Sequence, residues 1–287
     1  MATIEQRIEA VRTDRTHGSR WLAREAVAIL YDLATDAALT PAEAEQRLHS
    51  AAQKLSQARP AMAAVGGAVQ RILNVHGSLE DIARTAAELL EDIDSATTRI
   101  LTYARPLIKG TLMTHSLSGT VLAVLAACAS QIEQVIVLEG RPGYEGREVA
   151  RMLAKEGIAC TLITDAQADI FLPRCQAVIV GADTVLASGD VLNKAGTALL
   201  AWAAHGHKVP MYVLCETLKI SPRLWSGDLA LLEEKEPEEV LASPIPGVTA
   251  RNFYFDYTPA HLIAKVVSEQ GLLGRREIKQ VVARLYH

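Results

Sequence analysis

The 287-residue sequence predicts an α/β protein with a helical N-terminal domain at residues 1–97 and an α/β domain with a mostly parallel sheet at residues 98–287. Up to about residue 97, apolar residues recur at helical spacing and no strand pattern of any length appears. Beyond residue 98, short β-branched and apolar runs alternate with helical stretches, which is typical of βαβ units.

Local signals predict the helices of the first domain. Apolar residues repeat at helical spacing from Trp21 to Leu33. Thr40-Pro41-Ala42-Glu43 combines a capping box with proline at the first helical position, and the helix that it opens is expected to end before Pro60. A third helix is expected at 61–75, and Ser78, with Asp81 three residues on, starts a fourth.

The second domain is expected to alternate strands and helices. Strands are predicted at 111–114, 135–138, 160–164, 177–180 and 211–214, and helices at 119–129, 146–156, 190–205 and 259–270. Residues 221–250 carry Pro, Gly and an acidic run, which predicts a surface excursion.

Composition excludes several classes of protein. The chain is 49% hydrophobic and 22% charged with a net charge of -4, and no Lys/Arg run stands out, so we expect no nucleic-acid partner. The polar N-terminus and short apolar runs predict no secretory signal and no membrane span. The four cysteines form no CxxC pair and are expected to be buried free thiols in a reducing cytoplasm.

Polar residues follow the predicted strands, and right-handed crossovers place these loops at one sheet edge. The 114–120 loop is rich in hydroxyls and leads into a helix, so it predicts either a phosphate site or simple capping by Ser116 or Ser118. The 139–146 loop carries Arg141, which can bind an anion in a bidentate manner. Asp165, after the third strand, is either a cap or a ligand residue.

The fourth and fifth loops add an acid, an amide and two ammonium groups: Asp183, Asn193, Lys194 and Lys219. In an open α/β sheet, ligands bind outside the carboxyl ends of the strands. Together the loops predict a site for a phosphorylated small molecule. The alternative is that Asp183 and Asp190 cap a turn and a helix.

Other chemistries are not supported. A triad of His115, Ser116 and Asp183 lacks the G-x-S-x-G elbow, and the adjacent histidine and serine make a relay awkward. No HExxH or clustered Cys/His spacing predicts a metal, and no G-x-G-x-x-G predicts a dinucleotide. We therefore expect no metal and no cofactor.

The order of motifs resembles one superfamily. Gly181-Ala182-Asp183, Ser188-Gly189-Asp190 and the 193–197 segment resemble its signature. Further matches are Met113-Thr114-His115, Glu139-Gly140-Arg141-Pro142, Glu216-Thr217-Leu218-Lys219, Phe255-Asp256-Tyr257-Thr258-Pro259 and Arg59-Pro60. The superfamily joins the alpha, beta and delta subunits of translation initiation factor 2B, methylthioribose-1-phosphate isomerase and ribose-1,5-bisphosphate isomerase. By length and by the 216–219 motif, the chain looks nearest to the last branch.

The resemblance implies an N-terminal helical domain, a C-terminal Rossmann-like domain, and a homodimer or higher homo-oligomer formed through the second domain. It implies Asp183 as a catalytic residue and places Ser116 where the isomerases carry their catalytic cysteine. An alcohol transfers protons far less readily than a thiol, whose pKa is about 8.5. The substrate-binding positions that it implies, together with those from the loops, are His17, Gly18, Ser19, Arg20, Arg59, Thr114, His115, Arg141, Asn193, Lys194 and Lys219, with Arg15 or Arg20 as a cation near the N-terminus.

Two functions follow as hypotheses. The first is an aldose–ketose isomerase for a phosphorylated pentose, in which Asp183 transfers a proton. The second is a non-catalytic protein that binds a sugar phosphate or a nucleotide, as a regulatory subunit of factor 2B would, and Ser116 motivates it.

Overall fold

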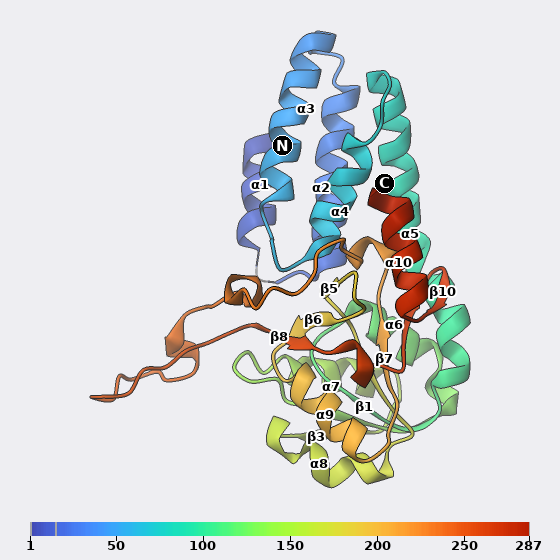
Figure 1. Ribbon diagram of the computed structural model, residues 1–287, viewed down its shortest axis with the longest axis vertical. Helices are drawn as coiled ribbons and strands as arrows, with labels where there is room; N and C mark the ends of the chain where they lie inside the picture. The colour runs from blue at the N-terminus through green and yellow to red at the C-terminus, as the bar shows by residue number, and fades with distance from the viewer. Residues whose placement is uncertain (1, 15, 287) are drawn as a thin grey trace.

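The computed structural model describes residues 2–14 and 16–286, and it has a helical part stacked on an α/β part (Figure 1). The helical part contains α1 (Ile4–Thr13), α2 (Ser19–Thr35), α3 (Pro41–Ser56), α4 (Ala63–Leu73) and α5 (Leu79–Ala104). Capping boxes at Thr3, Thr40 and Ser78 start α1, α3 and α5. The prediction of an all-helical N-terminal part is confirmed, with α1 added to the helices located from local signals.

Apolar faces of these helices form one core. It includes Leu22, Ile29, Leu30, Leu48, Leu55 and Ile72, all nearly inaccessible to solvent. Helix α5 crosses the boundary expected at residue 97, because its last turns belong to another core: Ile100 and Ala104 pack with Leu112 of the sheet. Helix α5 therefore connects the two parts of the molecule.

Within the described residues, the main sheet has seven strands in the order β10-β9-β7-β4-β1-β2-β3. They are β1 (Gly110–Thr114), β2 (Ile132–Leu138), β3 (Cys160–Ile163), β4 (Ala177–Val180), β7 (Met211–Leu214), β9 (Lys265–Ser268) and β10 (Gly271–Leu273). All neighbouring pairs are parallel except β9 and β10. The predicted mostly parallel, Rossmann-like sheet is confirmed.

Helices cover both faces of this sheet. One core joins α5, α6 (Gly119–Ala127) and α7 (Glu145–Lys155) to Val135, Val137 and Ile179. The other joins α8 (Ala168–Phe171), α9 (Thr197–Gly206) and α10 (Arg275–Tyr286) to Ile136 and Val178. Because β1 and β4 are neighbours while the chain winds outward from them in both directions, a crevice for a ligand is expected where they end.

The predicted helix at 190–205 is wrong in its first part. Residues Val191–Lys194 form β6, which lies between β5 (Thr184–Val185) and β8 (Phe255–Thr258) in a small antiparallel sheet. Helix α9 starts only at Thr197, after Gly196 adopts a left-handed φ of 107°. Asp190 does not cap α9. Its carboxylate accepts a hydrogen bond from the Ala260 amide at 2.8 Å.

The predicted helix at 259–270 is also wrong. This segment contains a short 3-10 turn, Ala260–Leu262, and then β9, in which Val266 and Val267 are buried and pair with β7. A short apolar run fits a buried strand as well as a helix, so its period alone does not decide. The helix that does form, α10, lies five residues beyond that segment, at Arg275–Tyr286.

The 221–250 segment forms the predicted excursion. It extends away from the body of the molecule (Figure 1) and contains the short 3-10 turns η6 (Leu229–Leu232) and η7 (Pro237–Glu239). Across residues 2–14 and 16–286, no helix has the length and apolar character needed to span a membrane.

Candidate functional site

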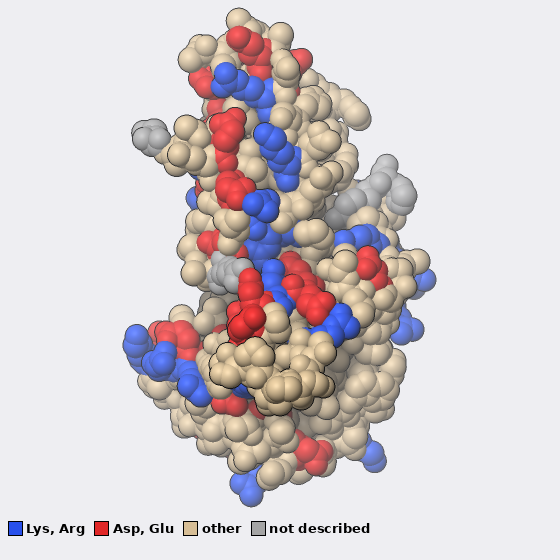
Figure 2. All heavy atoms as spheres, turned by 90° about the vertical axis from the view of Figure 1, so that its left-hand side faces the viewer, with Lys and Arg blue, Asp and Glu red and all other residues tan. Residues whose placement is uncertain are grey.

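Two adjoining cavities, of about 360 Å³ and about 430 Å³, lie at the carboxyl ends of β1 and β4. Gly18, Ser116, Leu117 and Asp183 line both, so the cavities meet at these residues. The loop before α2 contributes one wall and the sheet loops contribute the other. In Figure 2, acidic and basic side chains gather at the waist between the helical and α/β parts.

Asp183 lies three residues beyond the end of β4, where the two cavities meet. Its amide donates to Leu192 O at 3.0 Å, and its carbonyl accepts from the Ala63 amide at 3.2 Å, so both parts of the molecule hold its backbone. Desolvation raises the pKa of its carboxyl, against the lowering effects of Lys219 and Lys194. A carboxyl in this state is suited to exchanging protons closer to neutral pH than an exposed one.

A buried ion pair adjoins Asp183. Lys219 Nζ lies 3.5 Å from Glu216 Oε2, and both residues are almost fully buried. Glu216 Oε1 accepts from the Thr120 hydroxyl at 2.7 Å. Burial acts to lower the pKa of Lys219, but Glu216 and Asp183 outweigh it and raise the pKa, so Lys219 presents a permanent positive charge to the cavity that it lines.

Ser116 follows β1 in a left-handed conformation, with φ of 68°. Its Oγ donates to Glu145 Oε1 at 3.0 Å. Lys194 Nζ lies 3.6 Å from the same oxygen and 4.3 Å from the centre of the Tyr254 ring. A hydroxyl, a carboxylate and an ammonium group therefore stand in series on the wall of the larger cavity, with Asp183 on the same cavity.

His115 is buried and is held by one defined hydrogen bond. Its Nε2 lies 2.9 Å from Ala195 O, and since a carbonyl only accepts, Nε2 carries the proton. Burial lowers the pKa of the ring, so it is neutral and Nδ1 is an acceptor. Among the described residues, Nδ1 has no hydrogen-bond partner. The close approach also explains Gly196, because a Cβ there would lie 2.9 Å from His115 Nε2.

Two helices begin at the smaller cavity. Ser118 caps α6 by accepting from the Val121 amide at 3.3 Å, which confirms its predicted capping role. Gly18 is the N-cap of α2 and offers no side-chain acceptor to the first turn. Helix N-termini attract anions through their unpaired amides and the helix dipole, and this end of the cavity therefore suits a phosphate.

The residues predicted near the N-terminus also reach the cavities. His17 and Arg59 line the larger one, and Ser19 and Arg20 line the smaller one. Arg59 Nη1 donates to Asp14 O at 2.7 Å, and Arg20 Nη1 donates to Thr97 Oγ1 at 2.8 Å. Arg15 lies outside the described residues.

Asn193 lines the smaller cavity, where its Nδ2 donates to Thr197 Oγ1 at 2.9 Å. Thr114 and Arg141 are not among the described residues that line either cavity. The Thr114 hydroxyl donates to Ile179 O at 2.7 Å and so joins β1 to β4. Arg141 is exposed and donates to the Tyr144 hydroxyl at 2.7 Å.

Asp165 holds the loop that carries Arg141. Its two carboxylate oxygens accept from the amides of Gly140 and Arg141 at 2.9 and 2.8 Å. It therefore joins two loops, whereas the sequence predicted either a helix cap or a ligand residue.

Two carboxylates of the site were not among the predicted site residues: Glu145 and Glu216. Glu145 stands in the same loop as Arg141, at the first position of α7, and the loop placed it at the correct sheet edge. Glu216 belongs to the 216–219 motif, in which the sequence predicts a role only for Lys219. In both cases the sequence placed the residue in a loop or motif of the site, but it could not show that the side chain points toward the site.

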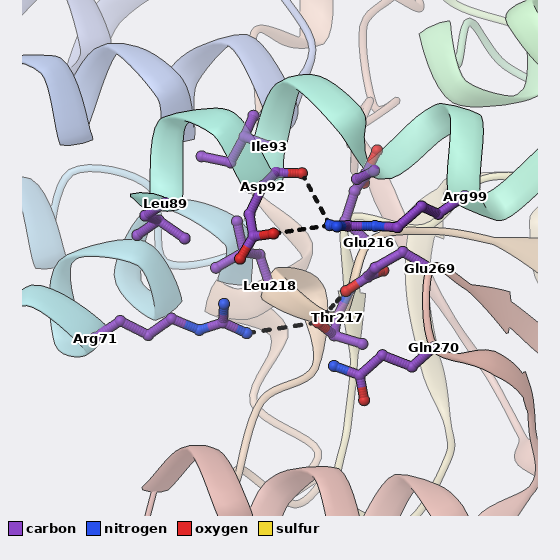
Figure 3. Close-up of a pocket in the computed structure, with 11 residues that line it drawn as sticks. Arg71, Leu89, Asp92, Ile93, Arg99, Glu216, Thr217, Leu218, Glu269 and Gln270 are labelled. Atoms are coloured by element: carbon purple, nitrogen blue, oxygen red, sulfur yellow. Dashed lines mark hydrogen bonds and ion pairs between the residues drawn. The ribbon is translucent and has the colours of Figure 1, made fainter. Parts of the chain in front are cut away.

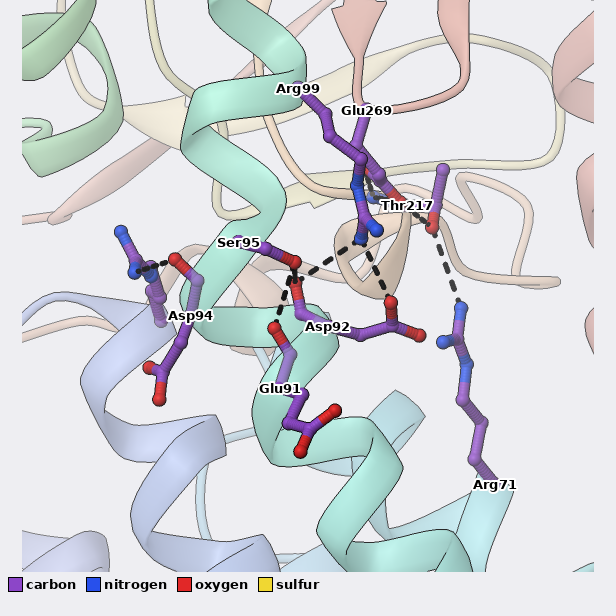
Figure 4. A network of polar contacts seen from close by, with 9 residues as sticks. Arg71, Glu91, Asp92, Asp94, Ser95, Arg99, Thr217 and Glu269 are labelled. Atoms are coloured by element: carbon purple, nitrogen blue, oxygen red, sulfur yellow. Dashed lines mark hydrogen bonds and ion pairs between the residues drawn. The ribbon is translucent and has the colours of Figure 1, made fainter.

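A third cavity, of about 270 Å³, lies at the junction of α4, α5 and the 217–219 turn (Figure 3). Its charged groups have partners within the protein: Arg99 Nη2 donates to Asp92 Oδ1 at 2.9 Å, and Glu269 accepts from the Thr217 amide. Arg71 reaches the Thr217 hydroxyl at 3.4 Å (Figure 4). The contacts of Glu269 and Arg71 with Thr217 hold the turn that carries Lys219, so we regard this cavity as structural support for the site.

Comparison with known proteins bears out the predicted superfamily. Residues 15–274 match the model of the Initiation factor 2 subunit family. The chain is 32% identical to a ribose 1,5-bisphosphate isomerase of Archaeoglobus fulgidus, over 95% of this chain and 90% of that protein. It is 30% identical to a methylthioribose-1-phosphate isomerase of Thermus thermophilus, over 80% of this chain and 75% of that protein.

Among solved structures, the fold matches that of the translation initiation factor eIF-2B of Pyrococcus horikoshii with a TM-score of 0.83 at 31% identity. The match covers 96% of this chain and 98% of that one. Similar proteins thus carry names of both kinds, isomerase and initiation factor.

Proposed function

The chain belongs to the Initiation factor 2 subunit family, and from that premise we propose that it is an aldose–ketose isomerase acting on a phosphorylated pentose of the ribose 1,5-bisphosphate type. The observation that carries the proposal is Asp183: a carboxyl with a raised pKa, at the switch point of the sheet, where two cavities meet. The relatives named as isomerases support the reaction class.

The cavities suit a substrate that is anionic at both ends. On one side of Asp183 lie Lys219, Arg20 and the first turns of α2 and α6. On the other side lie Lys194 and Arg59. A pentose with a phosphate at each end would place its reacting carbons beside Asp183. The exposed position of Arg141 does not support a phosphate contact from that residue.

The reaction needs a proton at the ring oxygen and another taken from the sugar. As the bond from C1 to the ring oxygen opens, the Asp183 carboxyl donates to that oxygen. It later accepts the proton of the C2 hydroxyl as the hydrogen on C2 moves to C1 and the ketone forms, and so returns to its starting state. His115 Nδ1, a buried neutral acceptor, is placed to orient a sugar hydroxyl.

The test is a direct assay with ribose 1,5-bisphosphate and with methylthioribose 1-phosphate. We expect ketose from the first, and we expect Asp183→Asn to reduce kcat by at least about 10²-fold, the usual range for removing a general acid or base. Asp228→Asn, at an exposed 3-10 turn, is the matched control and should leave kcat unchanged. No ketose from either sugar, with Asp183→Asn indistinguishable from wild type, would sink the proposal.

A second candidate is a non-catalytic binding protein, and Ser116 in place of a thiol favours it. It predicts heat of binding for sugar phosphates or nucleoside monophosphates in calorimetry without turnover. Measurable turnover removes it. A cytoplasmic location and self-association as a homodimer or higher oligomer stay predictions from the sequence.

A further inference from the structure

The contact between Ser116 and Glu145 has no part in the chemistry described so far. Ser116 Oγ donates to Glu145 Oε1 at 3.0 Å, and both side chains line the cavity that also contains Asp183 and Lys194. Ser116 is held in a backbone region that residues other than glycine seldom occupy. Such conformations concentrate at functional sites, where the surrounding structure enforces them.

Glu145 is held firmly where it meets Ser116. It is the first residue of α7, so its carboxylate lies at the positive end of a helix. The next residue, Gly146, packs so tightly that a Cβ would collide with the carbonyl oxygen of Leu138. Lys194 Nζ, 3.6 Å from Oε1, balances the charge of the carboxylate. The start of α7, the packing of Gly146 against β2 and the charge of Lys194 therefore fix Glu145 beside Ser116.

A serine hydroxyl alone is a poor proton acceptor near neutral pH, but a hydroxyl bonded to a carboxylate can take one proton while it passes on its own. We propose that Glu145 acts through Ser116 as the second proton-transfer group of the isomerase, so that the Ser116–Glu145 pair carries the hydrogen between C2 and C1. This inference rests on the proposed function and assigns the role of the missing thiol.

The protons and electrons balance without a further reactant. After ring opening, Ser116 Oγ takes the C2 proton as its own proton passes to Glu145 Oε1, and the C2–H electron pair becomes a C1–C2 double bond. When the C2 hydroxyl gives its proton to Asp183, that double bond takes a proton at C1 from Ser116 Oγ. Glu145 then returns a proton to Ser116. One hydrogen has moved from C2 to C1 and another from the C2 hydroxyl to the ring oxygen.

The test uses the full chain with ribose 1,5-bisphosphate and compares Glu145→Gln with Ser116→Cys in single and double variants. Glutamine still accepts a hydrogen bond from Ser116 and cannot take its proton. We expect Glu145→Gln to lower kcat by at least about 10²-fold with KM changed less than about threefold. A thiol ionises without help, so Ser116→Cys in the Glu145→Gln background should restore at least about tenfold of the loss.

Glu148→Gln is the matched control, because it removes a carboxylate from an exposed position on the same helix, where it pairs with Arg151. It should match wild type in kcat. Calorimetry with ribose 1,5-bisphosphate verifies that each variant still folds and binds. If the wild type turns over and Glu145→Gln is equally fast, the inference is overturned and the proposed function stands. The same holds if the double variant is no faster than Glu145→Gln alone. A wild type without turnover overturns both.

Discussion

At the residue scale, the Glu216–Lys219 pair decides the electrostatics of the smaller cavity. Both side chains are nearly inaccessible to water, and the Thr120 hydroxyl satisfies the other carboxylate oxygen. Burying two charges is costly, and a pair of this kind is stable only while both partners are present. Burial raises the pKa of Asp183 and the charge of the same lysine opposes that rise, so the pair links the stability of the fold to the chemistry of the site.

Lys219→Met should therefore destabilise the protein strongly. It leaves Glu216 buried without its counterion, which costs about 3–5 kcal/mol of the free energy of unfolding. Urea denaturation measures this. Adding Glu216→Gln should recover part of the loss, because the uncompensated charge is gone. Arg251→Met, which removes the partner of Glu234 from an exposed ion pair, should cost far less. Equal losses from the two variants would contradict the role assigned to burial.

Residue types and motif order predicted most of the residues of the candidate site, but they could not predict the directions of the side chains. Asp183, Ser116, Asn193 and Lys194, four of the residues that the sequence predicts for the site, line the two cavities. Arg141 and Glu145 stand four positions apart in one loop, and the structure brings the glutamate to the site. Tyr144, with a left-handed φ of 55°, turns the chain between them, and a tyrosine in the sequence does not predict such a turn.

At the element scale, the start of α9 depends on a residue far away in the sequence. Asp256, in β8, accepts from the amides of Gly196 and Ala198 at 2.7 and 2.9 Å through the same oxygen, Oδ2. The helix expected from Asp190 onward fails because Val191 and Leu192 find partners in β8. Local periodicity describes a segment in isolation, and pairing across some 60 residues overrides it.

The Asp256 cap predicts a pH dependence of stability. Desolvation raises the pKa of Asp256 to about 6, although the Ala198 and Gly196 amides lower it. Since the unfolded value is near 3.9, the folded state binds the extra proton, and this contribution is fully present below about pH 4 and is lost as the pH rises through about 6. The loss is at most about 3 kcal/mol.

Asp256→Asn keeps an acceptor for both amides and removes the titration. The difference in free energy of unfolding between wild type and variant, measured by denaturation at pH 4, 5, 6 and 7, should therefore move steadily in favour of the variant. Subtracting the two proteins cancels the other carboxyl groups. A difference that stays constant over this range would show that Asp256 does not titrate there.

At the scale of the whole molecule, the site exists only while the helical and α/β parts are joined. The Thr184 hydroxyl donates to Ala61 O at 2.8 Å, and Leu218 of the α/β part belongs to the core of the helical part. Helix α5 runs without a break from one core into the other. The change in hydrophobic pattern near residue 97 located the transition between the two parts, and it could not show that one helix spans that transition.

The two parts should accordingly unfold together, and Leu218 is the residue that tests this. Leu218→Ala should lower the free energy of unfolding by about 2–4 kcal/mol, because it opens a hole in the helical core. It should also weaken sugar-phosphate binding, since Leu218 adjoins Lys219 in the same turn. Leu224→Ala, at a side chain 66% exposed, should change stability by less than about 0.5 kcal/mol.

Hydrogen exchange read by mass spectrometry should show residues 20–95 and 110–215 losing protection at the same denaturant concentration. Separate transitions, with only the helical part responding to Leu218→Ala, would mean that the junction positions the site without coupling the two cores.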